Sequence, residues 1–525
     1  MLAVVPSATL DGLDGRLIHV EVDVAPGLPG FTIVGLPDAA LQEARERVRG
    51  AIRNAGYAFP PRRITINLAP AGLRKAGASL DLAMGIGILL GSEQVRAGPG
   101  DVALVGELSL GGEVRAVAGT LPMIAALARR GVARVIVANA AVDEARLVSG
   151  IDIIGADTLA DAAQVVRSRR SRPRPATMPR ITISGVVEGP SSPSERAGIL
   201  GETVEPDLAE VRGQLHARRG LEIALAGGHG LLLTGPPGVG KTLLARTIPG
   251  LLPPLDDDAA LAVSVVASAA GEGPIRALRR TPPFRAPHHT ASAASMVGGG
   301  PSLTPGEVTR ADHGVLFLDE LAEFDRDVLE ALRQPLEEGR VVIARAHRST
   351  MFPARFQLVA AMNPCPCGYA GSEPEDRCRC TRNEVERYQR RVSGPLRDRI
   401  DLWIEMPRVP PGVLVGGAPP EATADVAPRI AAVRAIGLPR NRGRLNGRLR
   451  GRQLRAVCRL DAVARREAEA LAETDAASGR GTERLLRVAR TIADLEGANT
   501  VSAQHLGEAA MYRSAGSRAD AALAS

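Results

Sequence analysis

The stretch that most constrains this fold is residues 230–248, GLLLTGPPGVGKTLLARTI. An apolar run, a glycine-rich loop and a helical pattern follow one another, which predicts a buried strand that turns into a helix. The loop has the pattern G-x-x-x-x-G-K-[ST], and its predicted nucleotide contacts are Gly235, Pro236, Pro237, Gly238, Val239, Gly240, Lys241, Thr242 and Leu243. Glycines let backbone N–H groups surround phosphate oxygens, and the helix N-terminus adds positive partial charge. The segment therefore predicts an α/β fold with a parallel sheet that binds ATP.

Two side chains of this loop have distinct chemical tasks. Lysine occurs only at Lys75 and Lys241, because arginine supplies the remaining basic residues. A lysine kept in the loop indicates a compact positive charge on the β- and γ-phosphates. We expect the Thr242 hydroxyl to bind the Mg²⁺ that accompanies ATP.

Polar side chains end the next two apolar runs. GVLFLDEL ends in Asp319 and Glu320, and FQLVAAMNP ends in Asn363. We expect Asp319 to hold Mg²⁺, Glu320 to polarise the attacking water, and Asn363 to help place that water beside the γ-phosphate. An asparagine at the end of a strand is, by itself, usually a turn residue.

The run RRVSGPLRDRIDLWIEM supplies a candidate arginine finger, Arg399. In a ring, such a side chain stabilises charge on the phosphoryl group held by the neighbouring subunit. The alternative is a salt bridge within the chain, to Asp398 or Asp401.

In the helical tail, Arg487 is a candidate to reach the γ-phosphate from a helical lid. Arg484 and Arg490 lie at neighbouring positions and compete for this role.

Shifts in composition predict four regions. Alternating strand-like and helical patterns occupy 1–166, and an Arg-, Pro- and Ser-rich flexible linker occupies 167–204. The nucleotide-binding α/β unit occupies 205–408, and helical periodicity dominates 409–525.

Overall charge favours a polyanionic partner. The net charge is +7 and the pI is about 9.6, which suits nucleic acid, although aromatics make up only 2% and argue against extensive base stacking. Neither a secretion signal nor a long apolar span is evident, so we expect a cytoplasmic protein without a membrane partner.

Several further motifs resemble one family. These are FRAPHHTAS at 284–292, GGGPSLTPGEVTRADHGVLFLDEL, NPCPCG at 363–368 and SGPLRDRIDL at 393–402. Together with GPPGVGKT they resemble the magnesium-chelatase-like branch of AAA+ ATPases, and within it the ComM/YifB family, over nearly the whole chain. The resemblance implies a homohexameric ring with an AAA+ core, a C-terminal helical lid and an N-terminal ribosomal-S5/Lon-protease-like domain. It also implies an ATP-driven helicase that acts on single-stranded or branched DNA and promotes branch migration in natural transformation.

The long insertion before Asp319 contains Arg285, His288, His289 and a glycine run at 298–300. It resembles a loop that projects into the pore of the ring. Structural packing near the nucleotide and metal binding by the histidines are the alternatives.

Two arginine-bearing segments are further candidates for DNA contact. One is a predicted hairpin with Arg345 and Arg348 at its tip, and the other is the stretch 438–455, LPRNRGRLNGRLRGRQLR. A solvated turn and a solvated lid surface are the respective alternatives.

Four of the five cysteines form two close pairs, Cys365-Pro-Cys367 and Cys378-Arg-Cys380. Two close pairs in a reducing compartment favour a structural Zn²⁺ with four thiolate ligands, while redox-active or free thiols are the alternative. Cys458 lies in an apolar helical pattern and is predicted to be buried.

The N-terminal region resembles Lon-type proteases without their complete dyad. Ser79 stands where the nucleophile is expected, but Leu121 stands where the partner lysine is expected. Leucine cannot accept a proton, and Lys75 lies on a different element, so we expect a catalytically silent domain. The remaining alternatives for the whole chain are a metal-chelatase motor subunit, an ATP-dependent protease and a nucleotide-gated scaffold.

Overall fold

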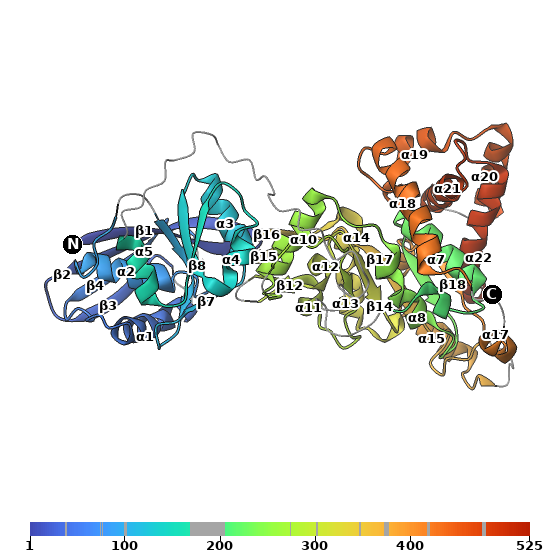
Figure 1. The fold of residues 1–525 in the computed structure, drawn as a ribbon. Helices are drawn as coiled ribbons and strands as arrows, with labels where there is room; N and C mark the ends of the chain where they lie inside the picture. Colours follow the sequence, from blue (N-terminus) through green and yellow to red (C-terminus); the bar gives the residue numbers. More distant parts are fainter. Residues whose placement is uncertain are drawn as a thin grey trace.

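The computed structural model describes the chain except residues 37–38, 74, 76, 99–101, 168–204, 274, 301–302, 346–347, 372–376, 417–419, 475–478 and 525. The predicted linker at 167–204 lies almost entirely outside the described residues. In Figure 1 the N-terminal unit and the C-terminal helices lie on opposite sides of a central unit.

The N-terminal unit has two main sheets. The first has the order β1-β2-β4-β3 and the second, all parallel, has the order β5-β8-β9. The strands are β1 (Leu2–Asp11), β2 (Asp14–Ala25), β3 (Gly30–Val34), β4 (Arg63–Ala69), β5 (Val102–Val105), β6 (Glu107–Leu108), β7 (Val114–Arg115), β8 (Arg134–Ala138) and β9 (Asp152–Ala156). The helices are α1 (Ala39–Asn54), α2 (Asp81–Gly91), α3 (Thr120–Arg129), α4 (Val142–Ala145) and α5 (Leu159–Arg167). Alternating apolar residues in β2 and β4 and the apolar side chains of α2 fill one core.

The central unit is built on a five-stranded parallel sheet with the order β11-β14-β17-β10-β18. Its strands are β10 (Leu231–Thr234), β11 (Phe284–Arg285), β14 (Val315–Leu318), β17 (Gln357–Met362) and β18 (Leu402–Glu405). Both faces are covered, which explains why these strands are continuously apolar: Leu231 and Leu233 face one core and Leu232 faces another.

Helices and two hairpins surround this sheet. The hairpins are β12 (Gly298–Gly299) with β13 (Thr304–Pro305), and β15 (Arg340–Arg345) with β16 (Arg348–Pro353). The helices are α7 (Leu215–Gly227), α8 (Lys241–Arg246), α9 (Ile248–Leu251), α10 (Asp257–Ala269), α11 (Ala293–Val297), α12 (Glu307–Arg310), α13 (Arg326–Ala331), α14 (Arg333–Glu338), α15 (Arg382–Gln389) and α16 (Gly394–Arg397). Mixed α/β architecture with parallel sheets is thereby confirmed.

The C-terminal part is helical, as predicted, and shares a core with the sheet. Its helices are α17 (Pro411–Val415), α18 (Thr423–Arg440), α19 (Gly451–Cys458), α20 (Ala462–Thr474), α21 (Gly479–Leu495) and α22 (Ala503–Ala524). Side chains from α18, α19 and α21 lie in the same core as Leu231 and Ile404. These helices therefore pack, together with α7, against the face of the sheet to which Leu231 and Ile404 belong.

The N-terminal unit docks on α10. The side chains of Leu261 and Val265 on α10 pack against the N-terminal core. At the same junction the buried carboxylate of Glu144 accepts hydrogen bonds from the Ser268 hydroxyl (2.5 Å) and the Leu121 backbone N–H (2.9 Å). The junction is thus both apolar and hydrogen-bonded.

Candidate nucleotide site and the family of the chain

The predicted catalytic side chains meet at one edge of the central sheet. Because β10, β14 and β17 are parallel neighbours in this sheet, the residues that follow them emerge together. These residues are the glycine-rich loop after β10, Asp319 after β14 and Asn363 after β17. We call this edge the nucleotide edge.

The glycine-rich loop has the backbone that its sequence requires. Gly238 and Gly240 have φ values of 80° and 95°, in the left-handed region that favours glycine. Gly235 is required for another reason, since a Cβ there would lie 2.4 Å from the Met406 carbonyl oxygen. Val239 is buried and Leu243 packs against the core, so these two residues anchor the loop and its helix.

Lys241 lies within this loop and is buried. Its ammonium donates hydrogen bonds to the carbonyl oxygens of Gly235 (2.6 Å) and Pro236 (3.0 Å) and to Asn363 Oδ1 (3.0 Å). Burial lowers the pKa of Lys241 to about 8, while Asp319 and Glu320 act in the opposite direction. A buried cation without a tightly paired carboxylate is well suited to an anionic ligand.

The predicted magnesium ligands contact each other. The Thr242 hydroxyl donates a 2.7 Å hydrogen bond to Asp319 Oδ2. A hydroxyl and a carboxylate oxygen are hard ligands of the kind that Mg²⁺ prefers, so this donor pair fits the ion. Asp319 Oδ1 also accepts from the backbone N–H of Glu320 (3.0 Å), which fixes the carboxylate.

Glu320 follows Asp319 in the chain, but its carboxylate contacts a residue outside the glycine-rich loop. Glu320 Oε2 lies 3.1 Å from His289 Nδ1, and the Glu320 backbone has a φ of 52°. The sequence analysis named His289 only as a residue of the insertion before Asp319. No motif in the sequence indicates that His289 contacts Glu320.

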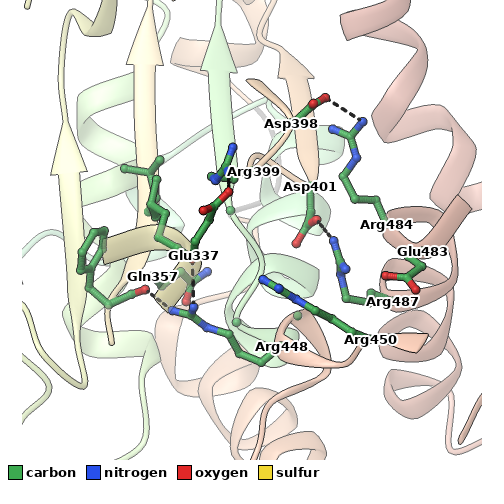
Figure 2. Close-up of a pocket in the computed structure, with 16 residues that line it drawn as sticks. Glu337, Gln357, Asp398, Arg399, Asp401, Arg448, Arg450, Glu483, Arg484 and Arg487 are labelled. Atoms are coloured by element: carbon green, nitrogen blue, oxygen red, sulfur yellow. Dashed lines mark hydrogen bonds and ion pairs between the residues drawn. The ribbon is translucent and has the colours of Figure 1, made fainter. Parts of the chain in front are cut away.

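The predicted arginine finger Arg399 and the predicted lid arginine Arg487 lie at the opposite edge of the sheet, where β10, β17 and β18 begin. They line a cavity of about 200 Å³ between the sheet and α21, which we call the arginine pocket. Figure 2 shows its charged lining, which consists of Arg399, Arg448, Arg450, Arg484, Arg487, Glu337, Asp398, Asp401 and Glu483.

Arg399 forms an ion pair with Glu337 and donates to the Pro395 carbonyl. Arg399 thus forms a salt bridge within the chain, the alternative considered from the sequence, but with an acid that the sequence did not indicate. Sequence reasoning missed Glu337, since it lies far away in the chain on α14.

Arg487 donates a 2.8 Å hydrogen bond to Asp401, which also lies 3.1 Å from His229 Nδ1. Burial alone would raise the pKa of Asp401, but Arg487 and His229 outweigh it and hold that pKa well below its usual range. Arg487 thus lies away from the glycine-rich loop of its own chain.

The two competing lid arginines have structural partners. Arg484 donates to backbone carbonyls and lies 3.7 Å from Asp398, whereas Arg490 is 1% exposed and bonded to Asp494. Arg490 is therefore a core residue.

The four paired cysteines converge next to the nucleotide edge. All four Sγ atoms lie within 4.8 Å of one another, with 3.4 Å from Cys365 to Cys367 and 3.7 Å from Cys367 to Cys378. Tetrahedral Zn–S bonds of about 2.3 Å place sulfurs about 3.8 Å apart, so this arrangement fits Zn²⁺. The loop that carries Cys365 and Cys367 also packs closely against the glycine-rich loop. A Cβ at Gly368 would lie only 2.8 Å from Pro237 Cδ. Cys458 is buried elsewhere, as predicted.

The arginine stretch 438–455 divides into two groups. Arg440 pairs with Asp494 and Arg448 donates to the carbonyls of Leu336 and Phe356, so these two are structural. The exposed members are Arg442, Arg444, Arg450, Arg452 and Arg455. The side chains of Arg345 and Arg348, at the other predicted DNA contact, lie outside the described residues.

In the N-terminal unit, Ser79 and Lys75 have separate partners. The Ser79 hydroxyl donates to the Ala8 carbonyl (3.0 Å), and the Lys75 ammonium donates to the carbonyls of Gly35 (2.9 Å) and Pro70. Leu121 is fully buried. Among the helices of the described residues, none is long and apolar enough to cross a bilayer.

Known protein families match the N-terminal, central and C-terminal parts of the chain. Residues 207–414 match the family described as magnesium chelatase, subunit ChlI, 20–141 match subunit ChlI of Mg-chelatase, and 420–513 match the ChlI C-terminal family. The chain is 42% identical to the uncharacterized protein YifB of Escherichia coli over 98% of this chain and 97% of that protein. It is 41% identical to the competence protein ComM of Haemophilus influenzae over the same shares. The chain therefore belongs to the magnesium-chelatase-like AAA+ ATPases of the ComM/YifB family.

Proposed function

We propose that this protein is a ring-forming ATPase that couples ATP hydrolysis to the remodelling of DNA, as a helicase or branch-migration motor in transformation or recombination. The observation that carries the ATPase part is the convergence of Lys241, Thr242, Asp319 and Asn363 at the nucleotide edge, with Thr242 bonded to Asp319 at 2.7 Å. The DNA part is supported by the net charge of +7 and by the relative named competence protein.

Each side chain has a defined task in this proposal. Lys241 and the loop N–H groups bind the phosphates, and Thr242 and Asp319 hold Mg²⁺, which supplies charge neutralisation for phosphoryl transfer. Glu320 polarises the attacking water and Asn363 orients it.

The arginine pocket supports assembly into a homohexameric ring. Arg399 and Arg487 lie together at the edge opposite their own nucleotide loop. In a ring, that edge faces the nucleotide edge of the adjoining protomer, and both guanidinium groups reach its γ-phosphate. Arg487 then acts on the neighbour rather than on its own chain, and the C-terminal helices serve as the lid.

The remaining regions bind DNA, brace the nucleotide site or form a domain without catalytic activity. The exposed arginines of 438–455 contact DNA phosphates, and the insertion that contains the β12–β13 hairpin projects into the pore of the ring. The four paired cysteines hold a structural Zn²⁺ that braces the loop after Asn363. Residues 1–166 form a silent S5/Lon-like domain, consistent with the partners of Ser79 and Lys75, which are backbone carbonyls.

The deciding experiment compares ATPase and strand-displacement rates on four-way, forked and linear DNA as salt is raised. We expect branched or single-stranded DNA to stimulate hydrolysis and the stimulation to fall with salt, because phosphate contacts release counterions. A chain whose ATPase responds to no DNA, but does respond to a porphyrin-metallating partner, would instead be a chelatase motor.

A further inference from the structure

One guanidinium group of the arginine pocket has no acidic partner. The other four bind within the chain, namely Arg399 to Glu337, Arg487 to Asp401, Arg484 to Asp398, and Arg448 to the carbonyl oxygens of Leu336 and Phe356. The remaining acid, Glu483, accepts a 2.9 Å hydrogen bond from the Gly451 backbone N–H. In the part of the chain that the structure describes, Arg450 is left without an ion pair or a side-chain hydrogen bond.

The local backbone places Arg450 beside Arg448. Leu449 (φ −74°, ψ 143°) and Arg450 (φ −145°, ψ 156°) are both extended, and α19 begins immediately after them. Because alternate side chains of an extended segment share a side, Arg448 and Arg450 both line the pocket while Leu449 between them is buried in the core. Figure 2 shows the Arg450 side chain reaching from the start of α19 towards the centre of the pocket.

This part of the pocket has positive charge and unused donors. Burial and the nearby charge of Arg450 lower the pKa of Arg448, so two guanidinium groups act on the same space. The Nε–H groups of Arg484 and Arg487, both on α21, are buried and have no hydrogen-bond partner among the described residues. A buried donor without an acceptor is unfavourable, so the pocket suits an anion that brings several oxygen atoms.

A phosphate group is such an anion, because a planar guanidinium can pair with two of its oxygens. In the proposed ring, the arginine pocket faces the nucleotide edge of the adjoining protomer, whose ATP presents a triphosphate to it. Arg399 and Arg487 must share or leave a carboxylate of their own chain to reach that triphosphate. Arg450 has no ion pair to break among the described residues.

We infer that Arg450 is a further catalytic residue, which contacts the γ-phosphate of the ATP bound by the adjoining protomer. This inference rests on the proposed ring ATPase. It separates Arg450 from the other exposed arginines of 438–455, which remain the proposed DNA contacts. It implies that Arg450 affects kcat in the absence of DNA and leaves the affinity of its own chain for ATP unchanged.

The first test measures steady-state ATPase kinetics of the full chain without DNA. In R450A we expect kcat to fall about ten- to hundredfold, the effect of losing one charge-assisted hydrogen bond, with wild-type affinity in a fluorescent-nucleotide titration. R450K should lose less, because an ammonium keeps the charge but cannot pair with two oxygens at once. R466A is the matched control, since it removes an exposed arginine from α20, outside the pocket, and should turn over ATP as wild type does.

The second test mixes variants, because a residue that acts on a neighbour can be supplied by another chain. E320Q subunits lack turnover at their own site but keep Arg450. Mixed with R450A subunits, they should restore turnover at the R450A sites. A chain with both substitutions, E320Q and R450A, has no Arg450 to donate and should restore nothing.

Three results would overturn the inference while leaving the ATPase proposal intact. These are a wild-type kcat in R450A and R450K, a lowered kcat that E320Q subunits do not restore, and a loss confined to DNA affinity. If R450A does not fold, R450K at wild-type thermal stability provides the same comparison. A wild-type chain that does not hydrolyse ATP, or stays monomeric with saturating ATP, would instead contradict the proposed function itself.

Discussion

Asp401 offers a quantitative test of the junction between the central sheet and the C-terminal helices. Its side chain is 6% exposed and binds Arg487, which is 12% exposed, and His229, which is fully buried. The substitution Asp401→Asn keeps the shape but removes the charge. It leaves the Arg487 guanidinium buried beside a neutral amide.

The expected magnitude follows from this burial. Removing one partner of a buried ion pair costs about 3–5 kcal/mol, and we take the lower value, about 3 kcal/mol, because an amide oxygen still accepts one hydrogen bond. The matched control is Asp398→Asn, whose partner Arg484 is 3.7 Å away and whose side chain is 45% exposed. Such an exposed pair contributes about 0–1 kcal/mol.

Thermal unfolding of the full chain, followed by circular dichroism, measures both variants. At about 2–4 °C per kcal/mol, Asp401→Asn should lower Tm by roughly 6–12 °C and Asp398→Asn by at most about 4 °C. Because the Asp401 pKa is held below its usual range, its contribution is present above about pH 4 and is lost as pH falls further. The difference between wild type and Asp401→Asn should therefore be equal at pH 7.5 and pH 5. Equal Tm shifts for the two variants would refute the buried-pair argument.

Three further predictions concern the nucleotide edge. Lys241→Ala should abolish ATP binding in a fluorescent-nucleotide titration, whereas Glu320→Gln should keep binding and lose turnover; turnover in Glu320→Gln would contradict its role. Gly235→Ala should weaken ATP binding by about tenfold or more, because the added Cβ meets the Met406 carbonyl at 2.4 Å, while Gly412→Ala, where a Cβ has open space, should bind normally. Replacement of both Cys365 and Cys367 by serine should remove the zinc measured by elemental analysis, whereas Cys458→Ala should retain it. Equal zinc contents in the two variants would show that the four paired cysteines are not the zinc site.

The sequence predicted the nucleotide edge well for a physical reason. Each strand of the sheet is an uninterrupted apolar run, and the polar residue that follows each run must lie at the edge where parallel strands end. Asp319 and Asn363, which end such runs, accordingly contact Thr242 and Lys241 of the glycine-rich loop. Helical periodicity predicted the C-terminal helices equally well, because α21 has one continuous apolar face.

The contacts that the sequence did not predict join distant parts of the chain. His229 and Asp401 are 172 positions apart, and Leu121 and Ser268 are 147 positions apart. No local pattern indicates which of many arginines pairs with which acid, so Glu337 as the partner of Arg399 and His289 as the partner of Glu320 emerged only from the fold.

The docking of the N-terminal unit on α10 has a consequence for how the chain can be divided. Leu261 and Val265 are covered by side chains from residues before the linker, and Glu144 satisfies the Ser268 hydroxyl and two backbone N–H groups, those of Leu121 and Ile275. A polypeptide that starts at residue 205 would expose this apolar stripe to water, together with the Ser268 hydroxyl and the Ile275 N–H. Residues 1–166 thus cover the apolar stripe of α10, and we expect a chain that lacks them to aggregate before any effect on ATP hydrolysis can be measured.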